Sequence, residues 1–455
     1  MRTRGGGADG ERHCPARRPE LVSTVPVPDA WHESYLPPAV GGGLLLAAAG
    51  AACDAVAGTV PALIALDARS AVERFRVRVP LGWRGAEGCQ VGVPRPLPDA
   101  RILLPVYQWD ESFTVYLIDA DGRILRADDL ADGREPALDV YGADVSVKLW
   151  QEPLAVGTGA YLASWVYRAY SWHLQCRDLA TGALRWEAAE RALAAAGDLA
   201  VTETAPGQDN GGEIVGRAIA DGRERWRLPP CQIFPRRARS FGVVVGDTAV
   251  LVDRGRRLAA EAAREEAIVA REAEFDVESD LDDLARAWER QHPAPGEELI
   301  GYDLVGGRER WRYPLGGEVV AIAEGPAMVC AVVVDGERRY RLERILVDGP
   351  RPRRSEPVDI DLGGGGDVAR RDPPVIAYVD ATHLLLAGST ELVCVSTPAP
   401  ETVVWRLPLP DSPLAPRPNP GDRRMLGASI AVAYGRVWVR GTDSAWMFVE
   451  AAGAS

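Results

Sequence analysis

The sequence is poor in histidine and lacks the residue patterns of common catalytic sites. Its five histidines occur singly, with no HExxH motif: His13, His32, His173, His292 and His383. Zinc sites and most acid–base pairs need such side chains close together. There is no GxSxG elbow and no P-loop, since Gly363–Gly366 is followed by Asp367 rather than by Lys and Ser or Thr. The sequence therefore predicts no catalytic residue and no metal site.

Cysteine is present, but not in the patterns of disulfide or zinc proteins. The seven residues are Cys14, Cys53, Cys89, Cys176, Cys231, Cys330 and Cys394. Their number is odd and no CxxC occurs, so the sequence indicates neither a disulfide framework nor a zinc site. Several lie in strand-like stretches, where a free cysteine behaves as a small apolar residue. This usage favours a reducing compartment, and we expect a cytoplasmic protein.

No hydrophobic run approaches the length of a transmembrane helix. The apolar run Ala39–Ala52 ends at Cys53, as in a lipoprotein signal, but no basic segment stands directly before it and Gly50 occupies the position where Leu is usual. We interpret the run as strand. The net charge of −13 argues against a nucleic-acid or anionic-membrane surface. The partners we expect are therefore other proteins, without nucleic acid or membrane.

What the sequence does contain is a repeat. Leu174–Trp186 carries an aspartate, a glycine and a tryptophan at steps of four, and Leu299–Trp311 repeats the pattern. Other copies are partial: Ile214–Trp226 has Ala218 in place of the aspartate, and Leu63–Phe75 ends on Phe. The repeat positions are Asp67, Phe75, Asp178, Gly182, Trp186, Gly222, Trp226, Asp303, Gly307, Trp311 and Trp405. Such recurrence is the signature of a repeat architecture.

One unit predicts a β-hairpin. Alternating residues form a strand, the glycine permits a turn, and a second strand carries the tryptophan, which buries its ring against the next hairpin. The pattern resembles the quinoprotein-type β-propellers, whose repeats are written AxDxxxGxxxW. The resemblance covers most of the chain and implies four-stranded blades, commonly eight, arranged in a ring. It does not imply a quinone, because many members bind none.

We therefore expect an all-β protein, a β-propeller of about eight four-stranded blades in one domain over residues 20–453. Outer strands are predicted near Phe75, Leu125, Trp186, Trp226, Trp311, Val358, Trp405 and Val25. The second unit lacks the tryptophan and has a short Asp121-Gly122 turn. The segment from Val319 to Ile360 has no tryptophan strand, so a seven-bladed ring stays open.

Ring closure is predicted to use the N-terminal segment. Residues 1–19 are polar, Gly-rich and basic, which indicates a disordered tail. The following Glu20–Pro28 resembles the strand that carries Trp405, since both alternate apolar residues with proline. The last repeat, Ala428–Glu450, supplies only three strands. We expect Glu20–Pro28 to add the fourth and so remove an exposed edge.

Residues 254–298 interrupt the fifth unit. Arg257–Ala273 is rich in helix-forming residues, and Ser279 begins a capping box before a second apolar helical face. This predicts a helical insertion. Its acidic run fails as an EF-hand, because Leu281 and Ala287 stand where Gly and Glu are needed.

The insertion is our candidate protein-interaction surface, through Asp276, Asp280, Leu281, Asp283, Leu284 and Trp288. The alternatives are that the acidic run is a solvated face and that the apolar face packs on its own blade.

The function we expect is a non-catalytic propeller scaffold, monomeric within a larger assembly. The alternative is a propeller like the dehydrogenases that depend on pyrroloquinoline quinone, or one that binds another small ligand. Quinone-using members carry adjacent cysteines, a calcium site and a catalytic aspartate, and this sequence has no Cys-Cys pair. We therefore expect no enzyme and no cofactor.

Overall fold

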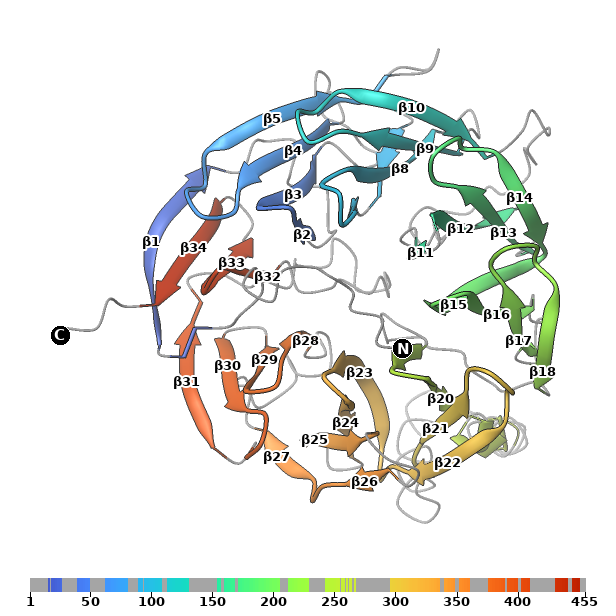
Figure 1. Ribbon diagram of the computed structural model, residues 1–455. Helices are drawn as coiled ribbons and strands as arrows, with labels where there is room; N and C mark the ends of the chain where they lie inside the picture. The colour runs from blue at the N-terminus through green and yellow to red at the C-terminus, as the bar shows by residue number, and fades with distance from the viewer. Residues whose placement is uncertain are drawn as a thin grey trace, which may run out of the picture.

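The computed structural model describes part of the chain in detail. The described residues are 15–16, 18–26, 39–49, 62–80, 89–92, 94–108, 113–130, 154–156, 159–167, 171–204, 212–228, 242–253, 255–257, 259–260, 262–263, 266, 295–335, 339–347, 352–360, 375–388, 391–399, 402–409, 430–440 and 444–450. Within them the protein is an all-β propeller whose sheets stand around a common centre (Figure 1); six sheets have four strands, and in the other two one edge is formed by two short strands.

Seven antiparallel sheets are each formed by one continuous stretch of chain. Sheet 1 contains β2 (Ala39–Gly41), β3 (Leu44–Ala49), β4 (Ala62–Asp67) and β5 (Glu73–Arg78). Sheet 2 contains β6 (Cys89–Val91), β7 (Arg95–Pro96), β8 (Ile102–Gln108), β9 (Phe113–Ile118) and β10 (Ile124–Asp129). Sheet 3 contains β11 (Leu154–Val156), β12 (Ala160–Tyr167), β13 (Ser171–Asp178) and β14 (Leu184–Ala188).

The next four sheets follow in chain order. Sheet 4 contains β15 (Glu190–Ala196), β16 (Leu199–Thr204), β17 (Ile214–Ala218) and β18 (Glu224–Leu228). Sheet 5 contains β19 (Gly242–Val245), β20 (Thr248–Asp253), β21 (Glu298–Asp303) and β22 (Glu309–Pro314). Sheet 6 contains β23 (Glu318–Gly325), β24 (Met328–Val334), β25 (Tyr340–Leu346), β26 (Arg353–Arg354) and β27 (Val358–Ile360). Sheet 7 contains β28 (Val375–Val379), β29 (His383–Ala387), β30 (Glu391–Ser396) and β31 (Val403–Pro408).

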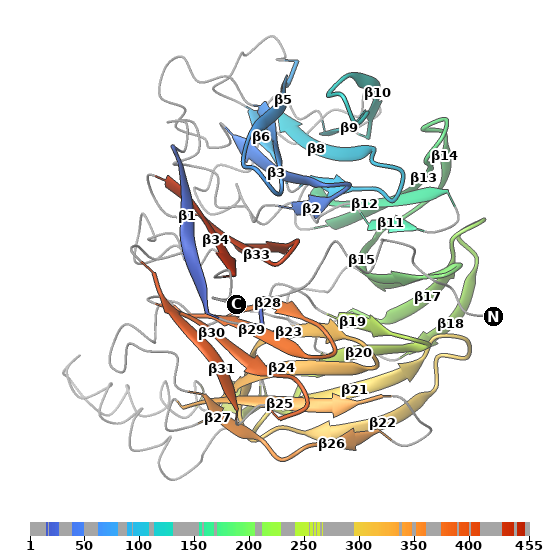
Figure 2. The same ribbon diagram turned by 60° about the vertical axis from the view of Figure 1, so that its left-hand side comes forward.

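Sheet 8 is shared between the two ends of the sequence. It contains β32 (Ile430–Ala433), β33 (Arg436–Arg440), β34 (Ser444–Glu450) and, as its outer strand, β1 (Pro19–Pro26). Strand β1 pairs antiparallel with β34, from Pro19 opposite Glu450 to Pro26 opposite Ser444, and Figure 2 brings this pair forward. The ring thus consists of seven sheets that are each formed by one segment of the chain. An eighth sheet is formed by two segments, one from each end of the sequence.

The core lies between the sheets. Residues of one strand alternate between the two neighbouring surfaces, because successive side chains of a strand point to opposite faces. On β12, Ala160 and Leu162 pack toward sheet 4 while Tyr161 and Ala163 pack toward sheet 2. We call the packed surface between two sheets a seam and name it by the sheets it joins.

The apolar run that ends at Cys53 contains strands, as predicted, because β2 and β3 lie within it. The tail prediction needs a correction at its boundary. Pro15 and Pro19 are buried, and β1 already begins at Pro19.

The insertion prediction is tested only at its start. Helical backbone occurs at Gly255–Arg257, Ala259–Ala260, Ala262–Ala263 and Glu266, and the described residues contain almost no other helix. The acidic run and the second predicted helix lie outside the described residues.

Candidate functional site

The six candidate interaction residues all fall outside the described part of the chain: Asp276, Asp280, Leu281, Asp283, Leu284 and Trp288. What the structure does show is where the insertion joins the ring. Arg257, in its first helical turn, donates to Glu318 of sheet 6 at 2.7 Å and lies 3.9 Å from the buried carboxylate of Glu297. Glu297 also accepts from the backbone N–H of Val319 at 2.8 Å. The first helical turn of the insertion, at Arg257, is therefore held at seam 5/6 by charged contacts.

In sheet 3 the repeated aspartate and glycine build the turn before the outer strand. The Asp178 carboxylate accepts hydrogen bonds from the backbone N–H groups of Ala180 and Thr181 at 3.0 and 2.9 Å. The N–H of Gly182 donates to the Asp178 carbonyl at 2.8 Å, and Gly182 has a φ of 75°, which glycine adopts without steric cost. Arg185 binds the other carboxylate oxygen at 2.7 Å. The hydrogen bond from the Arg185 side chain lowers the pKa of Asp178 most, and the bond from the Thr181 N–H comes second. Together they hold this pKa well below its ordinary range.

Two repeat tryptophans, Trp186 and Trp226, each cover the turn of the following sheet as a lid. A Cβ added to Gly222 would lie 2.6 Å from the ring of Trp186, and one added to Gly307 would lie 2.5 Å from the ring of Trp226. The indole N–H of Trp186 donates to the Ile219 carbonyl, and that of Trp226 to the Leu304 carbonyl, both at 2.9 Å. The repeat glycine is thus needed twice, for its backbone conformation and for the space under the ring. Phe75 covers Gly122 in the same way but has no donor.

The residue paired with the lid on the adjacent strand is small. Trp186 is opposite Cys176, Trp311 is opposite Gly301, and Trp405 is opposite Cys394. A Cβ on Gly301 would lie 2.1 Å from the Trp311 ring, so little space is left below the indole. Cys176 and Cys394 are fully buried there, which agrees with the sequence interpretation of these cysteines as small apolar residues.

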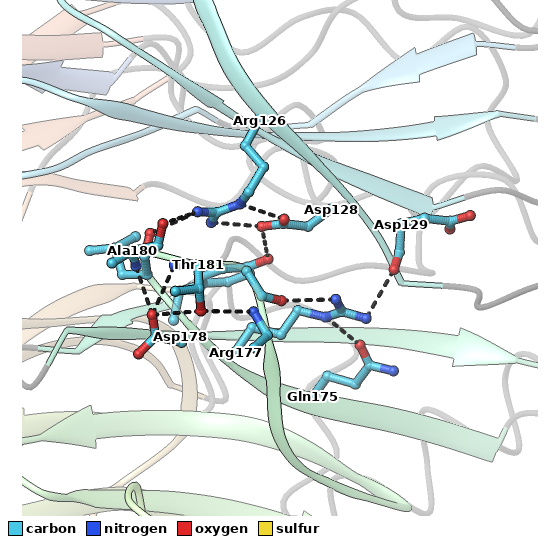
Figure 3. Close-up of polar contacts among 12 residues, drawn as sticks. Arg126, Asp128, Asp129, Gln175, Arg177, Asp178, Ala180 and Thr181 are labelled. Carbon is cyan, nitrogen blue, oxygen red and sulfur yellow. Dashed lines mark hydrogen bonds and ion pairs between the residues drawn. The ribbon is translucent and has the colours of Figure 1, made fainter.

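Sheet 2 replaces the tryptophan lid by an ion pair, as Figure 3 shows. Arg126 stands four residues after Gly122, where the tryptophan of other repeats stands. Its guanidinium binds the Asp128 carboxylate at 2.6 and 2.9 Å and donates to the carbonyls of Leu179 and Ala180 at 3.2 and 2.7 Å. The Leu179 carbonyl corresponds to the carbonyls of Ile219 and Leu304 that accept from tryptophan. The charged guanidinium of Arg126 therefore makes the hydrogen bond to a turn carbonyl that the indole N–H of tryptophan makes in sheets 3 and 4.

Two other seams use further variants of the contact. In seam 6/7, where sheet 6 has no tryptophan strand, Arg344 donates to the Thr397 carbonyl. In seam 8/1, Trp438 of β33 donates to the Ala68 carbonyl at 3.3 Å. Sequence reasoning missed both residues, because neither stands at a repeat position.

Seam 7/8 is completed by the chain before β1. The indole of Trp405 donates to the Pro15 carbonyl at 2.8 Å. A residue assigned to the disordered tail therefore supplies the contact that a hairpin turn supplies in other sheets.

Sheet 4 holds buried charges of its own. Arg191 on β15 pairs with Glu203 on β16, with both side chains almost completely buried. Burial raises the pKa of Glu203, and Arg191 and the N–H of Gly212 oppose this rise. Glu190 accepts from Arg217 at 2.7 Å and from the Thr202 hydroxyl at 2.6 Å. These charges therefore have partners inside the sheet.

The two ends of the strands carry connections of very different length. At one end lie tight turns, such as 42–43, 179–183, 197–198, 219–223, 246–247, 304–308 and 434–435. The other end carries the segments 27–38, 50–61, 79–88, 130–153, 205–213, 229–241, 254–297, 361–374 and 409–429. We call these ends the short-turn face and the long-loop face. The antiparallel order of strands sends all the long segments to the same face.

Within the described ranges, no three His, Cys, Asp or Glu side chains lie close enough together to hold a metal ion. The same part of the chain contains no helix of the length and hydrophobicity that a membrane crossing requires.

Comparison with known proteins supports the fold alone. No protein-family model matches the sequence, and no curated protein matches it. Among solved structures, BamB from Moraxella catarrhalis is 10% identical with a TM-score of 0.50, over 95% of this chain and 100% of that one. Sqt1 from Saccharomyces cerevisiae is 7% identical with a TM-score of 0.50, over 90% and 93%. A europium-containing methanol dehydrogenase is 12% identical with a TM-score of 0.49, over 88% and 83%.

The alignments with BamB and Sqt1 cover nearly all of both chains, which supports a propeller fold. At these identities a shared fold says nothing about a shared function.

Proposed function

We propose that this protein is a non-catalytic, cytoplasmic propeller scaffold that binds other proteins through its long-loop face. The single observation that carries the proposal is the difference between the two faces. Tight turns are repeated at one face, whereas every long connection leaves from the other. In repeat proteins, insertions gathered on one face often mark the binding surface.

The seams support this proposal because they make the ring a firm platform. Lid contacts from Trp186, Trp226 and Trp405 each reach a backbone carbonyl of the next sheet or segment. The strand ends from which the long loops leave are held at defined separations, which favours binding of a large partner at several points.

The insertion at 254–298 is the part of this face that we expect to contribute most. It is the longest connection, and it combines an acidic run with an apolar helical pattern. The contacts of Arg257 with Glu318 and Glu297 hold its first helical turn on the ring. We therefore expect the sheets to keep their structure when residues 259–294 are replaced.

The test replaces residues 259–294 by a short Gly-Ser loop and retains Arg257 and Glu297. Because β20 and β21 are already neighbours, closing the shorter loop costs little. The variant should keep its β-type circular dichroism, while a protein recovered stoichiometrically with the tagged full chain from its own host should be lost. Val305→Glu, at an exposed position on the short-turn face, is the matched control and should retain that protein.

If the loop-replacement variant folds and still recovers the same protein, the insertion is not part of the binding surface. Loss of the protein with Val305→Glu would assign binding to the short-turn face and contradict the proposal.

A further inference from the structure

Seam 2/3 departs from the repeat at three positions that contact one another. Arg126 takes the place of the lid tryptophan. Asp128, two residues later, stands where the other outer strands have Val77, Ala188, Leu228, Tyr313 and Leu407. Tyr161 stands where β3, β16, β20 and β29 have Leu45, Ala200, Ala249 and Leu384.

These three side chains form one buried cluster. The Tyr161 hydroxyl donates to Asp128 at 2.6 Å, and Asp128 also accepts from Arg126 at 2.6 and 2.9 Å. Asp128 is 6% exposed and Tyr161 is completely buried. Burial, together with the neighbouring Asp128, raises the pKa of the Tyr161 hydroxyl far above its ordinary value, so this group stays protonated and donates.

Further polar contacts cross the same seam. Arg177 donates to the Asp129 carbonyl at 2.9 Å (Figure 3). The Gln175 amide donates to the Leu130 carbonyl at 3.3 Å. At the seven other seams, strands of neighbouring sheets run close to each other, as β13 and β15 do at seam 3/4; among the described residues no strand pair does so to the same extent across seam 2/3. Polar side chains therefore bridge this seam beside the apolar cluster that contains Leu103, Phe113 and Ala163.

A seam closed by this polar cluster should separate more readily than one closed by an indole. Desolvating an ion pair costs energy that its attraction only partly returns, and on separation water solvates both charges again. An indole that leaves its site instead exposes a large apolar surface. Local opening takes place where the free-energy cost is smallest.

We propose that seam 2/3 is the place where this ring opens, with Arg126, Asp128 and Tyr161 acting as an ionic latch. In the closed state the latch joins β10 to the turn 179–183 and to β12. In the open state Arg126 and Asp128 remain paired on sheet 2, and the surface of sheet 3 that carries Tyr161 and Ala163 meets water.

The protein carries internal controls for a test. Cys176, Cys330 and Cys394 are fully buried in seams 3/4, 6/7 and 7/8 respectively. Ala163 is equally buried in seam 2/3, and cysteine adds only one sulfur atom there. In full-length Ala163→Cys protein, reaction with a maleimide can be followed at all four positions by peptide mass spectrometry. A difference in opening free energy of ~1.4 kcal/mol corresponds to a tenfold difference in labelling rate.

We expect the introduced cysteine to react about tenfold faster than each native buried cysteine, because seam 2/3 opens at a lower free-energy cost than the other seams. Adding Arg126→Trp, Asp128→Leu and Tyr161→Phe restores the apolar pattern of the other sheets and should bring the introduced cysteine to the rate of the controls. Should this combination fail to fold, Arg126→Lys gives a second test. Lysine cannot make the paired contact with Asp128, so labelling of the introduced cysteine alone should accelerate.

Equal rates at the four cysteines in the Ala163→Cys protein would overturn the proposal. So would acceleration of all four by Arg126→Lys, since that result indicates global unfolding rather than opening of one seam.

Discussion

At the scale of single residues, the repeat is explained by the contact between a ring and a glycine. The Trp186 ring lies directly above Gly222, which has a φ of 71°. The sequence suffices to identify both partners, because their spacing recurs. It does not show that they belong to different sheets and meet across a seam, since this depends on the order of the blades in space.

Gly222→Ala should destabilise the protein more than Gly197→Ala. Both glycines have positive φ, but a Cβ at Gly197 meets nothing within 4 Å. The control should lose about 1 kcal/mol of unfolding free energy for its backbone conformation. Gly222→Ala should lose roughly 1–3 kcal/mol more, because the Trp186 ring must move. Urea unfolding measures both, and equal losses would show that the lid contact contributes nothing.

The depressed pKa of Asp178 predicts a specific dependence on acid. Because the folded pKa lies below the unfolded one, this carboxylate stabilises the protein above pH of about 4 and loses its contribution as the pH falls further. Asp178→Asn should therefore show a smaller fall in melting temperature between pH of about 5 and 2 than the native protein. Arg185→Gln, which removes the main cause of the shift, should act in the same direction. An unchanged pH profile in both variants would contradict this origin of the shift.

At the scale of elements, the limits of prediction can be seen in sheets 2 and 8. The turn at Asp121-Gly122 and the missing tryptophan were visible in the sequence, and counting four residues from Gly122 leads to Arg126. The partners Asp128 and Tyr161 were not visible, because 33 residues separate them and only the fold joins them. Strand β1 was predictable from its likeness to the Trp405 strand. The Pro15 contact was not, since a backbone carbonyl leaves no mark in a sequence.

Truncations should separate these two N-terminal contributions. Removing residues 2–14 should leave thermal stability unchanged. Removing 2–18 also deletes Pro15, the acceptor of Trp405, and should cost about 1 kcal/mol of unfolding free energy. Removing 2–26 deletes β1, exposes the edge of β34 and should lower the melting temperature sharply and cause aggregation. Equal melting of all three truncated proteins would contradict closure of the ring by this segment.

At the scale of the whole molecule, fold and function separate. The propeller follows from a repeat that the sequence shows plainly, whereas a ring shared with BamB and Sqt1 at such low identity does not define an activity.

For this chain we expect neither saturable binding of pyrroloquinoline quinone in the presence of calcium nor dye reduction with alcohols or sugars. Calorimetry and a dye assay on the purified protein measure both. Tight binding with turnover would favour the enzyme over the scaffold.

The most direct test of the scaffold is a hydrogen-exchange footprint of the protein in its isolated complex, compared with the free protein. We predict new protection in the long-loop face, within segments 50–61, 205–213, 254–297 and 409–429, and unchanged exchange in the turns 179–183, 219–223 and 304–308. Protection concentrated in those short turns, with the long segments unaffected, would contradict the account.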